Sequence, residues 1–218
     1  MITRDYIMRL IRRFTQAIIK ILKAKDEQNF DIAFDEIKKV YNELIGIDPM
    51  LINSFSIPQI IEFLNKNPEY KKEKGLIVAK LLKEEGELVE LKEKDSERSL
   101  ALYLKSFNLF TELLNDNFND AGNYLDDINH AANRLKNRSI SGEVKYKLFR
   151  YFEVSGSFAE AENILYDLID SEYPGIINEA EQFYNRLEAK SDEELLNGNL
   201  PRYELNEGKQ YILRKKIY

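Results

Sequence analysis

Apolar residues recur at intervals of three and four along most of the chain, the spacing that places them on one face of an α-helix. The first example covers residues 3–25, where these positions form one wide stripe. Its members are Tyr6, Ile7, Leu10, Ile11, Phe14, Ala17, Ile18, Ile21 and Leu22. No segment alternates apolar and polar residues between turn signals, which is the pattern expected of a strand. The sequence therefore predicts an all-α protein without a sheet.

Start and stop signals divide this pattern into successive helices. Capping boxes, in which a serine and a glutamate or glutamine three positions later bind each other's backbone N–H groups, are predicted at Ser56, Ser157 and Ser191. Helices are predicted over residues 3–25, 30–45, 57–64, 69–93, 96–114, 118–136, 142–155, 158–171, 175–190 and from 192. The polar segment from Gly198 to Gln210 is predicted to be irregular.

Two windows of the chain share one spacing of large and small residues. They are Phe30-x-x-Ala33-x-x-x-Ile37-x-x-Val40 and Phe158-x-x-Ala161-x-x-x-Leu165-x-x-Leu168. The small residue in each leaves room for a large side chain of a neighbouring helix. This spacing is similar to the second half of a tetratricopeptide repeat, and Phe152-x-x-x-Gly156-x-Phe158 resembles the turn between the two helices of that repeat.

The resemblance implies antiparallel helical hairpins in an irregular right-handed solenoid. Hairpins are expected near 5–46, 79–110 and 142–172, within one domain spanning 1–190, and a short helix and C-terminal tail are expected at 191–218. The opening Arg4-Asp5-Tyr6-Ile7-Met8-Arg9 and the order of elements also resemble an uncharacterised bacterial family of tetratricopeptide-like proteins. That family has no assigned activity, so the resemblance supports a fold and does not indicate a function.

Few chemistries fit the composition. The chain has no cysteine and one histidine, His130, and it contains no phosphate-binding loop and no H-E-x-x-H motif. Asp127 and His130 share a helix face, but a di-iron bundle needs two such pairs, so we expect a solvent-facing histidine rather than a metal ligand. The carboxylates of Glu84-Glu85-Gly86-Glu87 and Glu90 are expected on a solvated helix face. We expect no catalysis and no cofactor.

The net charge of −6 is unevenly distributed. Residues 1–25 hold seven basic residues and one acidic residue, a charge of +6, so the rest of the chain carries −12. An acidic body argues against nucleic-acid binding. The basic first helix resembles a membrane-surface helix, but we favour packing on the helix at 30–45, with its basic residues opposite Asp31, Glu36 and Glu43. We expect no signal peptide and no membrane-spanning run, and therefore a soluble, cytoplasmic protein.

The remaining candidate site is the groove lined by the first helices of successive hairpins. Transferring the family's groove positions to this chain gives Lys80, Lys83, Glu87, Tyr146, Arg150 and Glu153. The leading hypothesis is a non-catalytic adaptor that binds a peptide or helix of a protein partner there, with an acidic peptide matching the cations. The alternatives are a structural homo-oligomer such as a homodimer, and a protein that binds a metal or small molecule through carboxylates.

Overall fold

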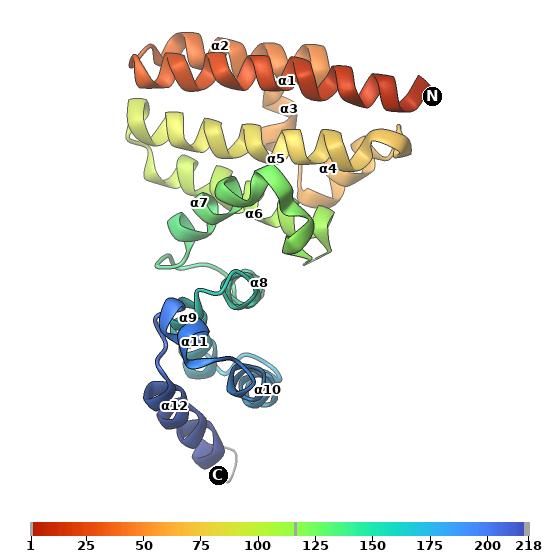
Figure 1. Ribbon diagram of the computed structural model, residues 1–218. Coiled ribbons are helices and arrows are strands. Elements are labelled where there is room, and N and C mark those ends of the chain that lie inside the picture. Colours follow the sequence, from red (N-terminus) through yellow and green to blue (C-terminus); the bar gives the residue numbers. More distant parts are fainter. Residues whose placement is uncertain (1, 116, 216–218) are drawn as a thin grey trace. The chain divides into compact units, whose positions relative to one another are not determined.

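The computed structural model describes residues 2–115 and 117–215, and within these ranges the regular structure is entirely helical, with no strand (Figure 1). The all-α prediction is therefore confirmed. The chain divides into two compact units, Met1–Leu135 and Lys136–Tyr218, each with its own buried apolar core. The boundary lies inside the range 1–190 that the sequence pattern assigns to one domain. No helix in the described ranges is both long and apolar enough to cross a membrane.

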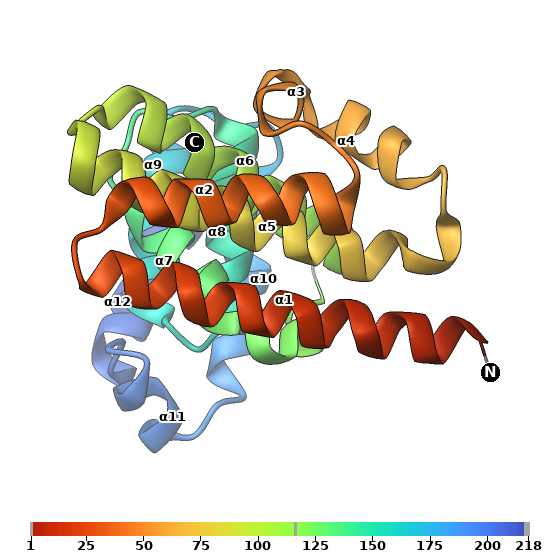
Figure 2. The same cartoon turned by 90° about the horizontal axis from the view of Figure 1, so that it is seen from above.

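The first unit begins with a helical hairpin. Helix α1 (Ile2–Asp26) lies beside α2 (Phe30–Val40), which continues through the π-helical turn η1 (Tyr41–Ile45) (Figures 1 and 2). Gly46 ends this helix in the left-handed conformation, at φ 83°. The α1 stripe is buried against the rest of the unit at Leu10, Phe14 and Ile21. Burying one side chain of this size stabilises the fold by about 1.5–3 kcal/mol relative to leaving it exposed. The first helix is thus docked within the hairpin, as the apolar pattern predicts.

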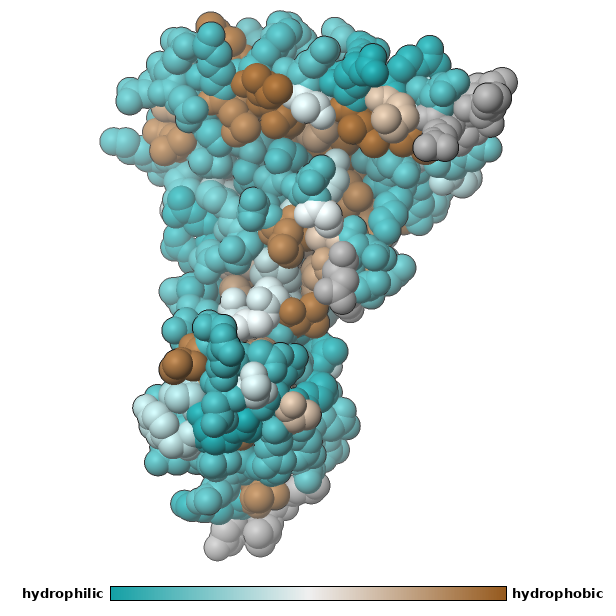
Figure 3. Space-filling model, in the orientation of Figure 1, coloured by the Kyte–Doolittle hydropathy of each residue, from teal (hydrophilic) through white to brown (hydrophobic). Residues whose placement is uncertain are grey.

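A second row of apolar side chains on α1 stays exposed. Met8, Ile11 and Ile19 have exposed fractions of 57%, 43% and 60%, so Ile11 lies outside the buried stripe to which the pattern assigns it. Figure 3 shows hydrophobic residues along this helix. Among the acidic residues expected opposite the basic side chains, Glu43 and Glu36 pair with α1, whereas Asp31 pairs with Lys92 instead.

Two short helices follow the first hairpin. Asp48 caps α3 (Pro49–Ser54), and Ser56 forms the predicted capping box with Gln59 at the start of α4 (Ile57–Leu64). The 3₁₀ turn η2 (Pro68–Tyr70) then leads into the second hairpin, and Tyr70 packs its ring against Tyr6 of α1.

Helix α5 is the central helix of the first unit. It spans Lys71–Leu88 and continues as η3 (Val89–Glu93), and α6 (Ser96–Leu114) returns beside it. Helices α1 and α2 contact α5 from one hairpin, while α6 and α7 (Leu125–Leu135) also contact it. Because neighbours cover α5 on several sides, apolar residues such as Ile77 and Leu81 and several charged residues alike are buried.

The prediction of one helix over 118–136 is wrong in its first half. Residues Phe118–Tyr124 form the 3₁₀ segment η4, and only then does α7 begin. Gly122 adopts φ 52° and ψ −124°, a conformation outside the helical region that glycine reaches readily. The kink at this residue separates the two segments.

The second unit contains five helices in its described part. They are α8 (Gly142–Val154), α9 (Phe158–Asp170), α10 (Ile176–Glu188), α11 (Asp192–Asn197) and α12 (Arg202–Lys215). Aromatic side chains fill its core, with Phe149 edge-on to Phe183. The capping box expected at Ser157 is absent, and Glu160 forms an ion pair with Lys136 instead, whereas the capping box at Ser191 is present.

Helix α12 corrects the expectation of an irregular segment from Gly198 to Gln210. Its buried face consists of Leu205, Gly208 and Ile212, and α12 packs against α10. A glycine inside a helix is unfavourable by about 1 kcal/mol relative to alanine, which obscures the helical pattern. Here Gly208 permits close packing, because a Cβ atom would lie 2.3 Å from the Tyr184 hydroxyl.

Candidate functional site

The three predicted groove residues of α5 are engaged within the first unit. Lys83 is buried, and its ammonium lies 2.5 Å from Glu84 and 3.1 Å from Asp127. Lys80 lies 2.6 Å from the other oxygen of Asp127, and Glu87 lies 3.0 Å from Lys25 of α1. These side chains therefore bind residues of α1 and α7 instead of lining an open surface.

Together, three lysines and three carboxylates form a balanced cluster, which we call the α5 charge network. Its members are Lys25, Lys80, Lys83, Glu84, Glu87 and Asp127. Burial opposes the ionisation of Glu84, but Lys83 and Lys25 outweigh it and lower the pKa of this carboxyl group. Burial likewise disfavours charged Lys83, yet Glu84 and Asp127 raise its pKa. The network is thus held as ion pairs, the form in which buried charges persist.

This network overturns the expectation that the carboxylates of α5 lie on a solvated face. Glu84 and Glu85 have exposed fractions of only 1% and 5%. Burial raises the pKa of Glu85, which accepts a hydrogen bond from Asn53 at 2.8 Å. The sequence does contain a signal for this burial, because α5 carries apolar residues on all sides, as fully covered helices do.

His130 lies beside the network and is half-buried rather than solvent-facing. Its ring centroid is 5.7 Å from that of Tyr103, and its buried Nε2 atom has no hydrogen-bond partner. Burial lowers its pKa, and the nearby Glu87 partly opposes this. Asp127 is bound to lysines, so it does not act with His130 as a metal-binding pair. In residues 2–115 and 117–215, no three histidine or acidic side chains are grouped to hold a metal ion.

The other three predicted groove residues lie on α8 in the second unit. Arg150 donates to Glu153 at 2.8 Å and to Glu179 of α10 at 3.2 Å. Arg186 of α10 binds both oxygens of Glu153, at 2.5 and 2.9 Å. Tyr146 stacks on Tyr173, with centroids 5.7 Å apart and planes 18° from parallel. Tyr146, Arg150 and Glu153 are therefore ordered by contacts within this unit.

A hollow of about 590 Å³ adjoins Arg150 and Glu153 but not Tyr146, and we call it the α8–α10 groove. Its wall includes Arg150, Glu153, Val154, Arg186, Leu187 and Lys190. Burial disfavours charged Arg186, but hydrogen bonds from this side chain to Glu153 and Glu179 raise its pKa. The groove thus combines fixed charges of both signs with apolar surface, an arrangement suited to ion pairing and apolar contact. Sequence reasoning located its α8 side but missed Arg186 and Lys190, which carry no repeat signature.

Comparison with curated proteins and with solved structures finds no match. A sequence model of a family of unknown function, DUF6483, matches residues 1–216, nearly the whole chain. The chain therefore belongs to the DUF6483 family, whose function is unknown.

Proposed function

We propose that this protein is a non-catalytic interaction module with a tetratricopeptide-like solenoid, which binds a peptide segment of a partner protein. The observation that carries the proposal is the α8–α10 groove. It is a hollow at Arg150 and Glu153, two of the three α8 positions that the repeat resemblance assigns to a peptide groove, and it offers charged and apolar side chains side by side.

The charged wall of this groove is already ordered. Glu153 and Glu179 hold the guanidinium groups of Arg150 and Arg186, so a ligand does not have to immobilise those long side chains. Pre-ordered side chains reduce the entropic cost of association, which is about 0.5–1.5 kcal/mol for each side chain immobilised on binding.

The chemistry of the wall defines the peptide that fits. Val154 has an exposed fraction of 42% and offers apolar contact. The two arginines are paired with Glu153 and Glu179, and Lys190 lies 3.0 Å from Glu194 of the same wall, so a ligand carboxylate would share these cations with the glutamates. The ligand we propose is therefore a segment with an apolar side chain next to an acidic side chain or a C-terminal carboxylate.

Site-specific photocrosslinking tests this proposal. A benzophenone amino acid replaces Val154 in the groove, and a matched protein carries it at Asn163, which is exposed on α9 and is not part of the groove wall. We expect a discrete adduct in native lysate from position 154 only. A synthetic peptide from the crosslinked segment should then bind Val154→Arg at least tenfold more weakly than wild type. Equal adducts at both positions, or none at 154, would contradict peptide binding in this groove.

A further inference from the structure

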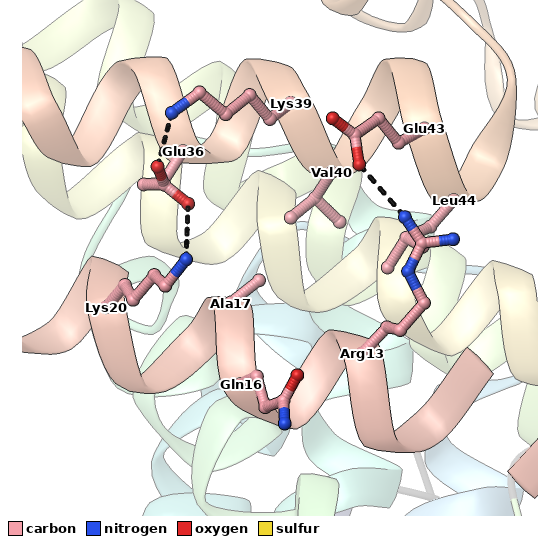
Figure 4. Close-up of a pocket in the computed structure, with 9 residues that line it drawn as sticks. All are labelled: Arg13, Gln16, Ala17, Lys20, Glu36, Lys39, Val40, Glu43 and Leu44. Carbon is pink, nitrogen blue, oxygen red and sulfur yellow. Dashed lines mark hydrogen bonds and ion pairs between the residues drawn. The ribbon is translucent and has the colours of Figure 1, made fainter. Parts of the chain in front are cut away.

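The outer side of the first hairpin carries a second groove, between α1 and α2. Two hollows of about 230 and 340 Å³ lie along it and share Arg13, Glu43 and Leu44 as lining residues. Figure 2 shows α2 beside the C-terminal part of α1, and Figure 4 shows the side chains of both helices that line the hollow of about 230 Å³. We call this feature the α1–α2 groove.

Nearly buried apolar side chains form the floor of the α1–α2 groove. Leu10, Val40 and Leu44 expose 8% or less of their surface. Between them Ala17 contributes only a methyl group, so the space above it stays open. The floor can accept an apolar side chain of a partner without moving the two helices.

The rim of the groove is positively charged, although the whole chain is acidic. Four cations, Arg9, Arg13, Lys20 and Lys39, line the two hollows, against the two carboxylates Glu36 and Glu43. Glu43 binds Arg13 at 2.9 Å, while Glu36 lies 2.5 Å from Lys39 and 3.9 Å from Lys20 (Figure 4). The side chains of Arg13, Lys20 and Lys39 remain 57%, 68% and 59% exposed. The rim therefore has two uncompensated positive charges, which complement an acidic ligand.

The same pair of helices already packs against a helix elsewhere in the unit. Helix α5 contacts both α1 and α2 through their buried sides. The outer groove offers the corresponding surface between two helices, with ridges and a hollow that suit a third helix. From Tyr6 to Lys20 the lining covers 14 steps of α1, about 21 Å at 1.5 Å per residue. This length matches a helix of about four turns.

We propose that the α1–α2 groove is the docking site of an acidic amphipathic helix of a partner protein. Its carboxylates pair with Arg9 and Lys20, and its apolar face covers Ala17 and Leu44. Symmetrical pairing with a second copy is disfavoured, because two copies of this groove would oppose like charges. This proposal rests on the proposed function as an interaction module. It concerns a different groove from the α8–α10 groove, so the crosslinking test at Val154 and the experiments below can fail independently of each other.

Fluorescence anisotropy with three synthetic 16-residue helical peptides tests the chemistry of the ligand. The first has a leucine face and glutamate flanks, the second replaces the glutamates by lysines, and the third replaces the leucines by serines. We expect the first peptide to bind at least tenfold more tightly than the other two, with an affinity that falls as salt is added. Equal binding of the acidic and basic peptides would overturn the proposal.

Variants of the protein locate the binding surface. Arg9→Glu with Lys20→Glu should weaken binding of the first peptide at least tenfold. Lys72→Glu with Arg138→Glu changes the net charge equally at exposed positions outside the groove, and should leave binding within twofold. An equal loss of peptide binding in both double variants would show nonspecific electrostatic attraction. Loss confined to Ile11→Ser with Ile19→Ser would place the peptide on the exposed apolar row of α1, and either result overturns the proposal.

Two further measurements distinguish other occupants of the groove. Flotation with phosphatidylserine vesicles should leave the wild-type protein unbound, and light scattering should give a monomer mass at micromolar concentrations. Vesicle binding that is lost in the Arg9→Glu, Lys20→Glu variant would instead identify a lipid surface as the occupant. A dimer that dissociates in that variant would identify a second copy, and both outcomes contradict docking of a partner helix.

Discussion

The carboxylate of Asp127 lies 2.6 Å from the ammonium of Lys80, although the two residues are 47 positions apart in the chain. The other oxygen of Asp127 lies 3.1 Å from Lys83, so one buried carboxylate of α7 serves two lysines of α5. Removing one partner of a buried ion pair is costly, because the remaining charge has already lost its hydration. Asp127 thus joins α7 to α5 through two ion pairs.

Replacing Asp127 by alanine should lower the free energy of unfolding by about 3 kcal/mol, because Lys83 then keeps an incompletely neutralised charge in the interior. Urea unfolding followed by circular dichroism measures this loss. Asp126→Ala is the matched control, since Asp126 is the exposed neighbour on the same helix, and it should change stability by no more than about 0.5 kcal/mol. Similar losses in both variants would show that the ion pairs of Asp127 do not stabilise the unit.

The pH dependence of stability should reveal the charge of Glu84. Its pKa in the folded protein lies below the ordinary 4.5, because Lys83 and Lys25 outweigh the effect of burial. Ionised Glu84 therefore stabilises the fold above pH 4.5, and this contribution is lost as the pH falls through 4.5 to the lower folded pKa. The stability difference between wild type and Glu84→Gln, measured by urea unfolding, should be largest near pH 7 and shrink towards pH 3.

Glu62→Gln provides the control for this measurement, because Glu62 is exposed on α4 of the same unit. The difference between wild type and this control should stay small at every pH. If the stability difference between wild type and Glu84→Gln were equally large at pH 7 and pH 3, the glutamine would destabilise the fold for a steric reason rather than through the lost charge.

Local sequence patterns account for most of the helices, because the spacing of apolar residues and the capping signals act within a few positions. The stripe of α1 and the capping box at Ser56 are both found where the pattern places them. The burial of Glu84 is different, since it depends on Lys25, 59 positions away. A charge-rich segment is expected to be solvated until the distant partners that neutralise it are known.

Glycines explain the two misplaced helical segments. Gly122 breaks the helix predicted over 118–136 through its backbone conformation, whereas Gly208 lies inside a helix where the pattern predicts none. One glycine serves a backbone angle and the other a close contact, and the sequence alone does not distinguish them. The α8–α10 groove is predicted only in part. The repeat spacing indicates its α8 residues, but no repeat pattern marks Arg186 of α10.

His130 is the one histidine of the chain, so its imidazole signal can be assigned without ambiguity. Burial, reinforced by Lys83 and Arg134 and opposed by Glu87, holds its pKa below 6.5. A proton NMR titration should therefore give a midpoint below 6.5. Glu87→Gln removes the opposing negative charge and should lower the midpoint further, whereas Glu112→Gln, at an exposed position of α6, should leave it unchanged. A midpoint at or above 6.5 would contradict the half-buried position of the ring.

Gly208 should resist substitution even though it lies inside a helix. Alanine favours a helix over glycine by about 1 kcal/mol, but a Cβ atom here would lie 2.3 Å from the Tyr184 hydroxyl and 2.6 Å from Glu162. Overpacking of this kind costs about 1–3 kcal/mol, so Gly208→Ala should lower the unfolding temperature. Asn206 is exposed on the same helix, so Asn206→Ala gains helix propensity without a clash. This control should keep the unfolding temperature unchanged or raise it slightly. If Gly208→Ala raised the unfolding temperature as well, α12 would not pack this closely against α9 and α10.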